Sequence, residues 1–242
     1  MEDHTSDGSM TNGHTGTVPR RLFSTKSPPK VSDLEQICSQ SISAKDCPLA
    51  EAIEKNIPIY NATHFDLNDA QNISDLQDEL HHILLSGPGV FVLKNTYTDH
   101  APINTANTAF QTVIAHERSS KKGDHFSPTG KNDRVWNSLG KHCLTDPSSF
   151  IAYYSNPWLS LISETWLGPA YRLTAQLNIV HPGGAPQVSH RDYHLGFQTQ
   201  EACSRFPQAT QVASQFLTLQ GAVAHEDMPL ASGPTRFLPF SQ

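Results

Sequence analysis

The feature that most constrains the fold is a run of alternating apolar and polar side chains over residues 171–179. A period of two is typical of a β-strand with one face on a core and the other in a polar setting. The apolar face carries Tyr171, Leu173, Ala175, Leu177 and Ile179, and the other face carries Arg172, Thr174, Gln176 and Asn178. Pro182-Gly183-Gly184 then predicts a tight turn. The chain thus predicts a strand that lines a polar pocket.

A possible metal-binding pair follows this turn, in the sequence His190-Arg191-Asp192. In an extended segment alternate side chains point the same way, so His190 and Asp192 would offer an imidazole and a carboxylate to one ion. These are two of the three ligands of a 2-His-1-carboxylate triad, whose open positions suit non-haem Fe(II) oxygenases. The pattern therefore predicts a metal site at His190 and Asp192.

The same His-x-Asp spacing occurs at residues 64–66 and 225–227, where neither pair follows a comparable alternation. We interpret residues 64–66 as part of a loop in which Asp66 or Asn68 caps the next helix. The apolar run at 215–224 predicts a strand, and we interpret His225 as a solvent-exposed residue at its end. His225 is the first alternative if a third iron ligand lies within this chain.

Other segments show the signals of regular structure. Residues 1–30, rich in small and polar side chains, are predicted to be disordered. We expect helices at 74–85 with Ser74 as the cap, at 105–117, and at 157–167 with a proline in the first turn and Gly168 at the end. We expect strands at 57–60 and 90–93, the latter buried. Residues 118–133 are predicted to form a long polar loop, lid or substrate loop.

At this point the residues resemble the phytanoyl-CoA dioxygenase family of Fe(II)- and 2-oxoglutarate-dependent oxygenases, in a fungal-type branch, from about Asp75 to the last residue. The motifs that carry the resemblance are Leu167-Gly168-Pro169, Gln176-x-Asn178, the Pro-Gly-Gly turn, Gln187-x-x-His190-x-Asp192, and the segment 233–241. It implies an α+β or mainly β fold, a double-stranded β-helix (jelly roll, cupin-like) with flanking N-terminal helices. The expected division is a disordered segment 1–30, an N-terminal extension 31–73 and a dioxygenase-like domain 74–242.

The resemblance also implies a site. His190 and Asp192 would bind Fe(II), with 2-oxoglutarate and dioxygen as co-substrates and ascorbate as a possible support. Gln176 and Asn178 would be pocket amides that fix the co-substrate or the ligands, and Arg134 and Trp136 would belong to the wall of the co-substrate mouth. A surface cation beside a half-buried aromatic is an equally good interpretation of Arg134 and Trp136.

In the family, a second iron-binding His and an Arg for the far carboxylate of 2-oxoglutarate lie beyond a segment like 233–241. The sequence ends at Gln242, so we expect the domain to be incomplete and the chain alone to be a poor catalyst or none. Three functions stay open. They are a dioxygenase that hydroxylates a small organic substrate, a non-catalytic protein of the same fold with a binding or regulatory role, and a cupin-like metal hydrolase or isomerase.

Composition narrows the partners. The formal net charge of −6 gives no basic footprint for nucleic acid or for a membrane surface. No apolar run reaches the roughly 20 residues that cross a bilayer, and the start lacks a secretory signal pattern. The four cysteines form no C-x-x-C pair and are predicted to be reduced thiols. We expect a cytoplasmic protein, with the peroxisome left open, a small-molecule substrate as partner, and no prediction of the oligomeric state.

Overall fold

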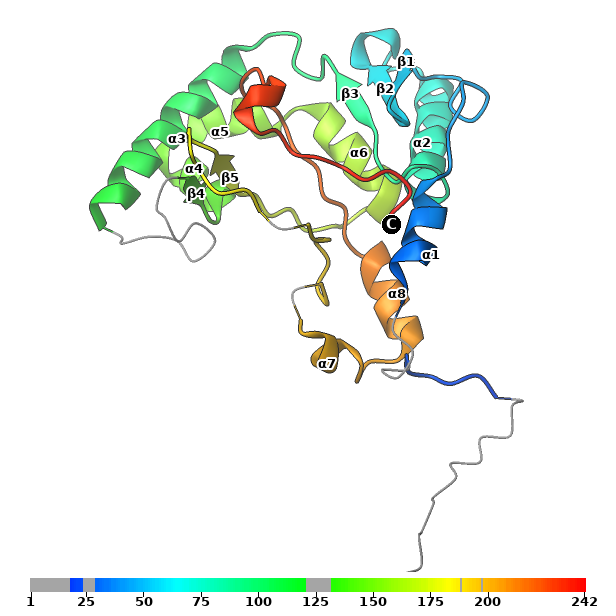
Figure 1. Cartoon of the computed structure of the whole chain (residues 1–242). Coiled ribbons are helices and arrows are strands. Elements are labelled where there is room, and N and C mark those ends of the chain that lie inside the picture. The colour runs from blue at the N-terminus through cyan, green and yellow to red at the C-terminus, as the bar shows by residue number, and fades with distance from the viewer. Residues whose placement is uncertain (1–17, 24–28, 121–131, 188, 197) are drawn as a thin grey trace, which may run out of the picture.

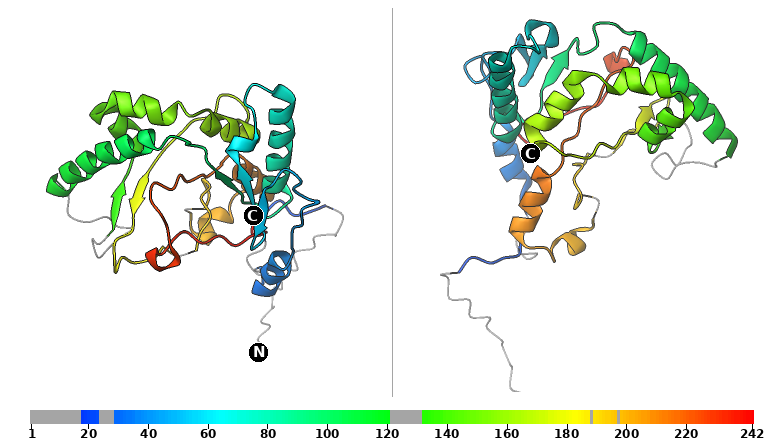
Figure 2. Two further views of the ribbon diagram at one scale, coloured as in Figure 1. Left: turned by 90° about the horizontal axis from the view of Figure 1, so that it is seen from above. Right: turned by 180° about the vertical axis from the view of Figure 1, so that it is seen from behind.

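The computed structural model describes residues 18–23, 29–120, 132–187, 189–196 and 198–242. Figures 1 and 2 show the helices and small sheets as an arch, with the chain from residue 168 onward running below it as mostly irregular backbone. The helices are α1 Val31–Cys38, α2 Ala70–Leu85, α3 Ala101–Ser120, α4 Ser138–Thr145, α5 Pro147–Tyr154, α6 Pro157–Leu167, α7 Gln200–Cys203 and α8 Gln208–Phe216. The strands are β1 Ala52–Glu54, β2 Ile57–Asn61, β3 Val92–Lys94, β4 Asp133–Val135 and β5 Leu177–Ile179.

One arm of the arch is a three-stranded sheet packed with α2 and α6. Strand β2 is central: it pairs antiparallel with β1 and parallel with β3. The core of this arm consists of Tyr60, Ala62, Leu76, Leu80, Trp158 and Leu161. Leu76 and Leu80 are fully buried one turn apart on α2, as an apolar stripe on one helix face predicts.

The two helices of this arm begin at side-chain caps. Asp69 accepts hydrogen bonds from the backbone N–H groups of Gln71 and Asn72, so α2 starts at Ala70 and the predicted cap at Ser74 is wrong. The helix starts at this earlier position because Asp69 accepts hydrogen bonds from two N–H groups that would otherwise lack partners. Helix α6 has the predicted bounds, with Asn156 as its cap and Gly168, at φ 69°, as its end.

The other arm packs α3, α4 and α5 around an aromatic cluster. Tyr97, Ala106, Phe110 and Tyr153 are its buried members, and Leu177 of β5 packs against them. Helix α3 is longer at both ends than the predicted 105–117. The strand predicted at 57–60 is present as β2, but the strand predicted at 90–93 starts at Val92, whose side chain is 44% exposed rather than buried.

The C-terminal part departs most from the expectations. Only Leu177–Ile179 of the predicted strand 171–179 pairs with another strand, and Leu173 of its apolar face is exposed. The strand predicted at 215–224 is wrong: Gln208–Phe216 form α8 and the following residues have no regular structure. A strand is stable only when a neighbour accepts its backbone hydrogen bonds, and no partner strand lies beside residues 217–224 in the described part of the chain.

The fold is therefore α+β, as predicted at the coarse level, but the described residues form no closed barrel. The jelly roll stays a prediction. All four cysteines are free thiols, in agreement with the sequence. Among the described residues no helix is long and apolar enough to cross a membrane. The long loop predicted at 118–133 lies mostly outside the described residues, as does most of the predicted disordered segment.

Candidate functional site

Three of the four residues predicted to contact the co-substrate, Arg134, Trp136 and Asn178, lie on one face of the ribbon formed by β4 and β5. The two strands are antiparallel, with Arg134 opposite Asn178. Side chains of a strand alternate between its two faces, so Arg134 and Asn178 lie on the face opposite the buried Val135, and the Trp136 ring lies against the Arg134 guanidinium. Gln176 is exposed and lies just before β5, outside the paired residues.

Arg134 contacts Trp136 and Gln187 on this face. Its guanidinium carbon lies 4.7 Å from the centre of the Trp136 ring, an arrangement in which a cation is attracted to the aromatic face. With the Gln187 amide oriented so that its oxygen faces the guanidinium, Nη2 and Nη1 of Arg134 donate to that oxygen at 3.0 and 3.3 Å. Gln187 belongs to the motif that contains His190, so Arg134 joins the ribbon face to the segment predicted to bind metal.

The opposite face of the ribbon carries a charged network. Arg118 of α3 donates from Nε to Asp133 Oδ1 at 3.0 Å and pairs with the second carboxylate oxygen. His181 Nε2 lies 2.7 Å from Asp133 Oδ2. Burial works against ionisation of Asp133, but the hydrogen bonds and charges of Arg118 and His181 outweigh it and lower the pKa of the carboxyl group. The ionised Asp133 thereby ties the ribbon to α3.

Two requirements explain the Pro-Gly-Gly turn. Gly183 has φ 76°, a conformation that side chains other than glycine rarely adopt. Gly184 leaves space for Asn132, whose Oδ1 would lie only 1.8 Å from a Cβ at that position. Asn132 Nδ2 donates to the Ala185 carbonyl at 3.1 Å, and Asn132 Oδ1 accepts from the His181 N–H at 3.3 Å. Asn132 thus holds both ends of the turn that leads to His190.

The predicted metal ligands lie side by side. His190 Nε2 and Asp192 Oδ1 are 3.5 Å apart, with side chains 41% and 26% exposed. Two ligand atoms bound at right angles to one ion at about 2.0–2.2 Å would be about 3 Å apart, so this spacing suits neighbouring ligands. The segment itself is irregular rather than a strand, so their closeness does not come from strand alternation.

A third protein ligand is not in place among the residues that the structure describes, because they contain no cluster of three His, Cys, Asp or Glu side chains fit to hold a metal ion. His194, the next histidine, has its Nδ1 at 2.6 Å from the Ser214 hydroxyl. If His190 and Asp192 are ligands as predicted, the described residues hold two of the three donors of a facial triad, and the fit to Fe(II) is partial.

His225 is not the solvent-exposed strand end that the sequence predicts. Its Nε2 lies 2.8 Å from the Tyr153 hydroxyl and its Nδ1 lies 2.6 Å from Asn107 Oδ1. Burial lowers the pKa of its imidazole. Both ring nitrogens are engaged with the α3 and α5 helices, so His225 anchors the C-terminal chain instead of completing a metal site.

The structure adds two residues that sequence reasoning did not place in the site. The sequence motif contains Gln187, three positions before His190. Only the structure shows that Gln187 contacts Arg134. Asn132 gave no sequence signal, because its role depends on a turn some 50 residues further along the chain. The other predicted pair, His64 and Asp66, makes local contacts: His64 with Asn61, and Asp66 with Asn68.

Comparison with known proteins identifies the family to which the chain is similar. The family model described as phytanoyl-CoA dioxygenase (PhyH) matches residues 63–242, which include the ribbon, the turn and the His190-x-Asp192 segment. No curated protein and no solved structure gives a match.

Proposed function

We propose, from the premise that this chain belongs to the phytanoyl-CoA dioxygenase family, that it acts as a non-haem Fe(II)- and 2-oxoglutarate-dependent dioxygenase on a small organic substrate. The family is an Fe(II)/2-oxoglutarate type of oxygenase. The observation that carries the proposal is the convergence of Arg134, Trp136 and Gln187 next to the His190–Asp192 segment. A cation, amides and a metal-ligand pair on one surface suit a co-substrate with a keto acid at one end and a carboxylate at the other.

His190 and Asp192 would hold the iron. A neutral imidazole and an ionised carboxylate each donate an electron pair to a metal ion. Their side chains are partly exposed, which leaves room for a bound co-substrate. When bound, the iron supplies the oxidative chemistry of the family. The third ligand position is outside what the described residues provide.

Arg134 would bind a carboxylate of 2-oxoglutarate. Its planar guanidinium offers paired N–H donors that match the two oxygens of a carboxylate. Trp136 packs against the guanidinium and Gln187 accepts from it, so the group is held in position before a ligand arrives. Gln176 and Asn178, the predicted pocket amides, would add hydrogen bonds to the co-substrate. We further propose that β4 and β5 are strands of the jelly roll expected for the family.

A second function is favoured by one observation, the incomplete ligand set among the described residues. A protein that keeps the fold and the ribbon face without a working iron centre would bind a carboxylate-bearing small molecule and have no turnover. The two proposals agree on Arg134 and differ on whether His190 and Asp192 matter. Metal binding and turnover therefore separate them.

The deciding experiment measures succinate formation from 2-oxoglutarate with Fe(II) and ascorbate, and metal binding by calorimetry with Mn(II) as a redox-stable substitute. For a dioxygenase we expect iron-dependent succinate, abolished by His190→Ala and by Asp192→Ala. The matched control is His64→Ala, which alters the same His-x-Asp spacing in a loop. Metal binding that survives both His190→Ala and Asp192→Ala contradicts the ligand assignment.

The role of Arg134 is tested by 2-oxoglutarate affinity. Replacing it in Arg134→Gln removes charge-assisted hydrogen bonds worth about 1.5–3 kcal/mol, so Kd should rise roughly 10- to 150-fold. Arg172→Gln, an exposed arginine in the chain leading to β5, is the control and should leave Kd unchanged. Equal affinities of the Arg134→Gln and Arg172→Gln variants would overturn the assignment.

A further inference from the structure

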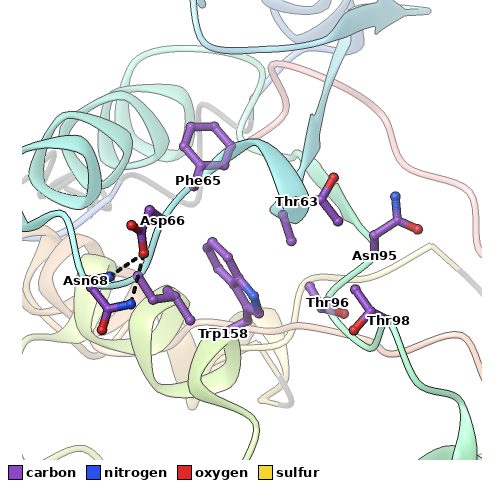
Figure 3. A pocket seen from close by; sticks show the side chains of 10 residues that line it. Thr63, Phe65, Asp66, Asn68, Asn95, Thr96, Thr98 and Trp158 are labelled. Atoms are coloured by element: carbon purple, nitrogen blue, oxygen red, sulfur yellow. Dashed lines mark hydrogen bonds between the residues drawn. The ribbon is translucent and has the colours of Figure 1, made fainter.

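A hollow lies away from the candidate site, in the arm of the arch that contains α2, α6 and the three-stranded sheet. It has a volume of about 300 Å³ and lies between the end of β2, the loop after it, the loop after β3 and the start of α6. Its lining is Ala62, Thr63, Phe65, Asp66, Leu67, Asn68, Asn95, Thr96, Thr98 and Trp158. Figure 3 shows these side chains around the Trp158 ring. None of them belongs to the ribbon or to the His190-x-Asp192 segment.

The hollow continues past Trp158. A neighbouring hollow of about 270 Å³ shares Thr96, Thr98 and Trp158 with the first. It adds Asn156 and Pro157 at the start of α6 and residues of α3 and α5. Each volume is at or just below the lower end of small-molecule sites, about 300–1,000 Å³. The two hollows together form a short groove with Trp158 at its middle.

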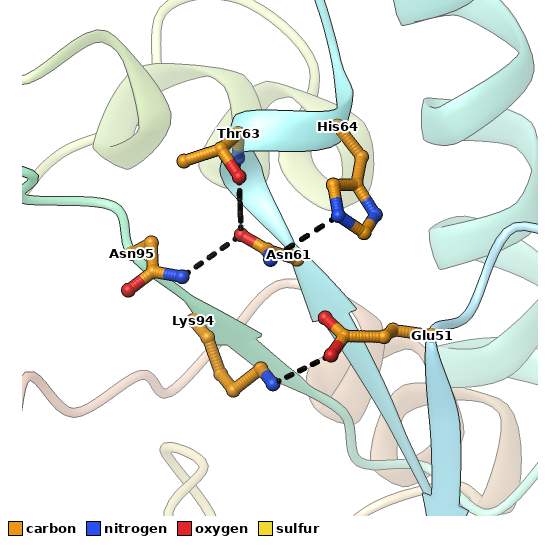
Figure 4. Close-up of polar contacts among 6 residues, drawn as sticks. All are labelled: Glu51, Asn61, Thr63, His64, Lys94 and Asn95. Carbon is orange, nitrogen blue, oxygen red and sulfur yellow. Dashed lines mark hydrogen bonds and ion pairs between the residues drawn. The ribbon is translucent and has the colours of Figure 1, made fainter.

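The walls of the groove are held in place by the protein itself. Asn61 Oδ1 accepts from the Thr63 hydroxyl at 2.9 Å and from Asn95 Nδ2 at 2.9 Å, which joins the ends of β2 and β3 (Figure 4). Asn156 Nδ2 donates to the Thr96 carbonyl at 2.7 Å, which fixes the loop after β3 to the start of α6. A ligand would therefore meet a groove whose shape exists before binding.

Several polar groups remain for a ligand once these contacts are counted. Asn95 uses its amide nitrogen within the protein, and Asp66 uses Oδ1 to accept from Asn68. That leaves Asn95 Oδ1 and Asp66 Oδ2 as acceptors. In the part of the chain that the structure describes, no hydrogen bond engages the Thr96 or Thr98 hydroxyl, and Figure 3 shows both on the wall of the hollow opposite Asp66. A hydroxyl both donates and accepts.

Charge and apolar surface restrict the ligand further. Asp66 is the single carboxylate of the first hollow and Asp99 that of the second, with no lysine, arginine or histidine in either lining. An anion such as a phosphate or a carboxylate would meet repulsion and no cationic partner. Phe65 and Trp158 supply apolar surface against which the C–H face of a ring can pack. Trp158 is only 6% exposed, so a ligand could touch only a small part of its ring.

We propose that this groove binds a neutral polyhydroxylated molecule, a sugar or a related polyol. Adjacent hydroxyls of such a ligand donate to the free carboxylate oxygen of Asp66 and to Asn95 Oδ1, and accept from the threonine hydroxyls on the other wall. Its C–H surface packs on Phe65 and Trp158. The ligand carries no negative charge, because the lining holds Asp66 and Asp99 and no cationic partner. This site is independent of the iron and 2-oxoglutarate proposal, because the two share no residue.

The test uses the full chain with the indole of tryptophan labelled for NMR, titrated with D-glucose, D-mannose, myo-inositol and glycerol at millimolar concentration. We expect a saturable shift of the Trp158 signal with at least one of these polyols and no shift of the Trp136 signal. Thr98→Val, which removes a hydroxyl at constant shape, should weaken binding about five- to tenfold, the effect of one lost hydrogen bond. Asp66→Asn, which keeps the acceptor for Asn68, should weaken it as well.

Thr108→Val is the matched control, since Thr108 is exposed on α3 and uses its hydroxyl within that helix. It should bind the polyol like the parent protein. Cyclohexanol and gluconate, a ring without the polyol pattern and a charged polyol, should bind more weakly than the best neutral polyol. The proposal is overturned by no saturable shift with any of the four polyols, by equal affinity of Thr98→Val and the parent, or by tighter binding of gluconate.

Discussion

The two halves of the molecule differ in how their apolar side chains are used. In residues 29–167 the helices and strands bury Tyr60, Leu76, Leu80 and Ile83 completely. In the described part of residues 168–242 only Leu195 and Phe240 are buried hydrophobic residues, and Leu217 is 74% exposed. The difference follows the regular structure, because among the described residues of this half only β5, α7 and α8 are strands or α-helices, and packed elements are what buries apolar faces.

The C-terminal half is nevertheless attached to the arch at defined points. His225 bonds to Tyr153 and Asn107 on one arm. On the other arm, the Phe240 N–H donates to the Pro88 carbonyl at 2.9 Å, and Gln242 Nε2 donates to the Gly87 carbonyl at 2.7 Å. Figure 1 shows the last residues running below the arch between these anchors. A few polar contacts thus hold a segment that has little core of its own.

The largest effect should come from the buried core. Leu80→Ala removes a fully buried side chain and leaves a cavity between α2 and the sheet, so the free energy of unfolding should fall by about 2–5 kcal/mol. The same change in the other half, Leu217→Ala, should lie within about 0.5 kcal/mol of the parent. Urea unfolding of both variants measures the contrast. A costly Leu217→Ala would show that the exposed side chain is covered in solution.

A second effect concerns the turn before His190. Gly184→Ala places a Cβ on Asn132 and should cost about 1–3 kcal/mol of local or global stability. In the double variant Asn132→Ala/Gly184→Ala the collision with Asn132 is absent and a 3.0 Å contact with the His181 carbonyl remains, so the added cost of Gly184→Ala should become smaller. Hydrogen exchange around the turn and urea unfolding give the coupling between the two positions. Independent, additive costs would mean that Asn132 does not occupy that space.

The third prediction concerns the loss of stability when a helix cap is removed in each half. Asn156→Ala removes the cap of α6, whose side chain accepts from the Trp158 N–H at 2.9 Å, and should cost about 1 kcal/mol. Asn156→Asp keeps the capping acceptor but replaces the amide that donates to the Thr96 carbonyl by a carboxylate oxygen, so it should not restore the full stability. Thr199 caps the four-residue α7 in the C-terminal half. Thr199→Ala should change stability by less than Asn156→Ala, because no residue of α7 is buried.

The smallest effect is expected on mild acidification. Burial lowers the pKa of His142 and His225 below the ordinary 6.5, so the folded protein binds protons less readily than the unfolded chain. These two histidines therefore leave stability unaffected above about pH 6.5, and stability falls as the pH drops below that value toward their folded pKa values. Thermal unfolding followed from pH 7.5 to 5.5 should show this decline.

The variants His142→Gln and His225→Gln separate the two contributions to this pH dependence. Each should flatten the decline below pH 6.5, and the exposed His64→Gln should not. His225→Gln should also increase proteolysis between residues 217 and 229, because it alters the anchor on α3 and α5. A pH profile that is identical in all three variants would show that these buried imidazoles do not carry the effect.

Much of the first half could be read from the sequence because its signals are local. The helix 157–167 has the predicted bounds, since its proline, its apolar stripe and Gly168 all lie within the element. Helix α2 begins at Ala70, four residues before the predicted start at Ser74. Both Asp69 and Ser74 are capping residue types, and only the folded backbone selects Asp69. For the site, the sequence predicted the residues as separate candidates, and the structure brings Arg134, Trp136 and Asn178 onto one ribbon face. Their role in binding stays a prediction.

What the sequence determined by itself was therefore the family, helix α6 with both of its ends, and the residue types of the candidate site. The tertiary structure decided which strands exist, since residues 217–224 have a strand-like pattern but no neighbouring strand among the residues that the structure describes. It also decided that His225 is an anchor, because its two hydrogen-bond partners lie 72 and 118 positions away in the chain. Local patterns encode helices and turns, whereas strand pairing and the environment of a single histidine depend on which distant segments the folded chain brings together.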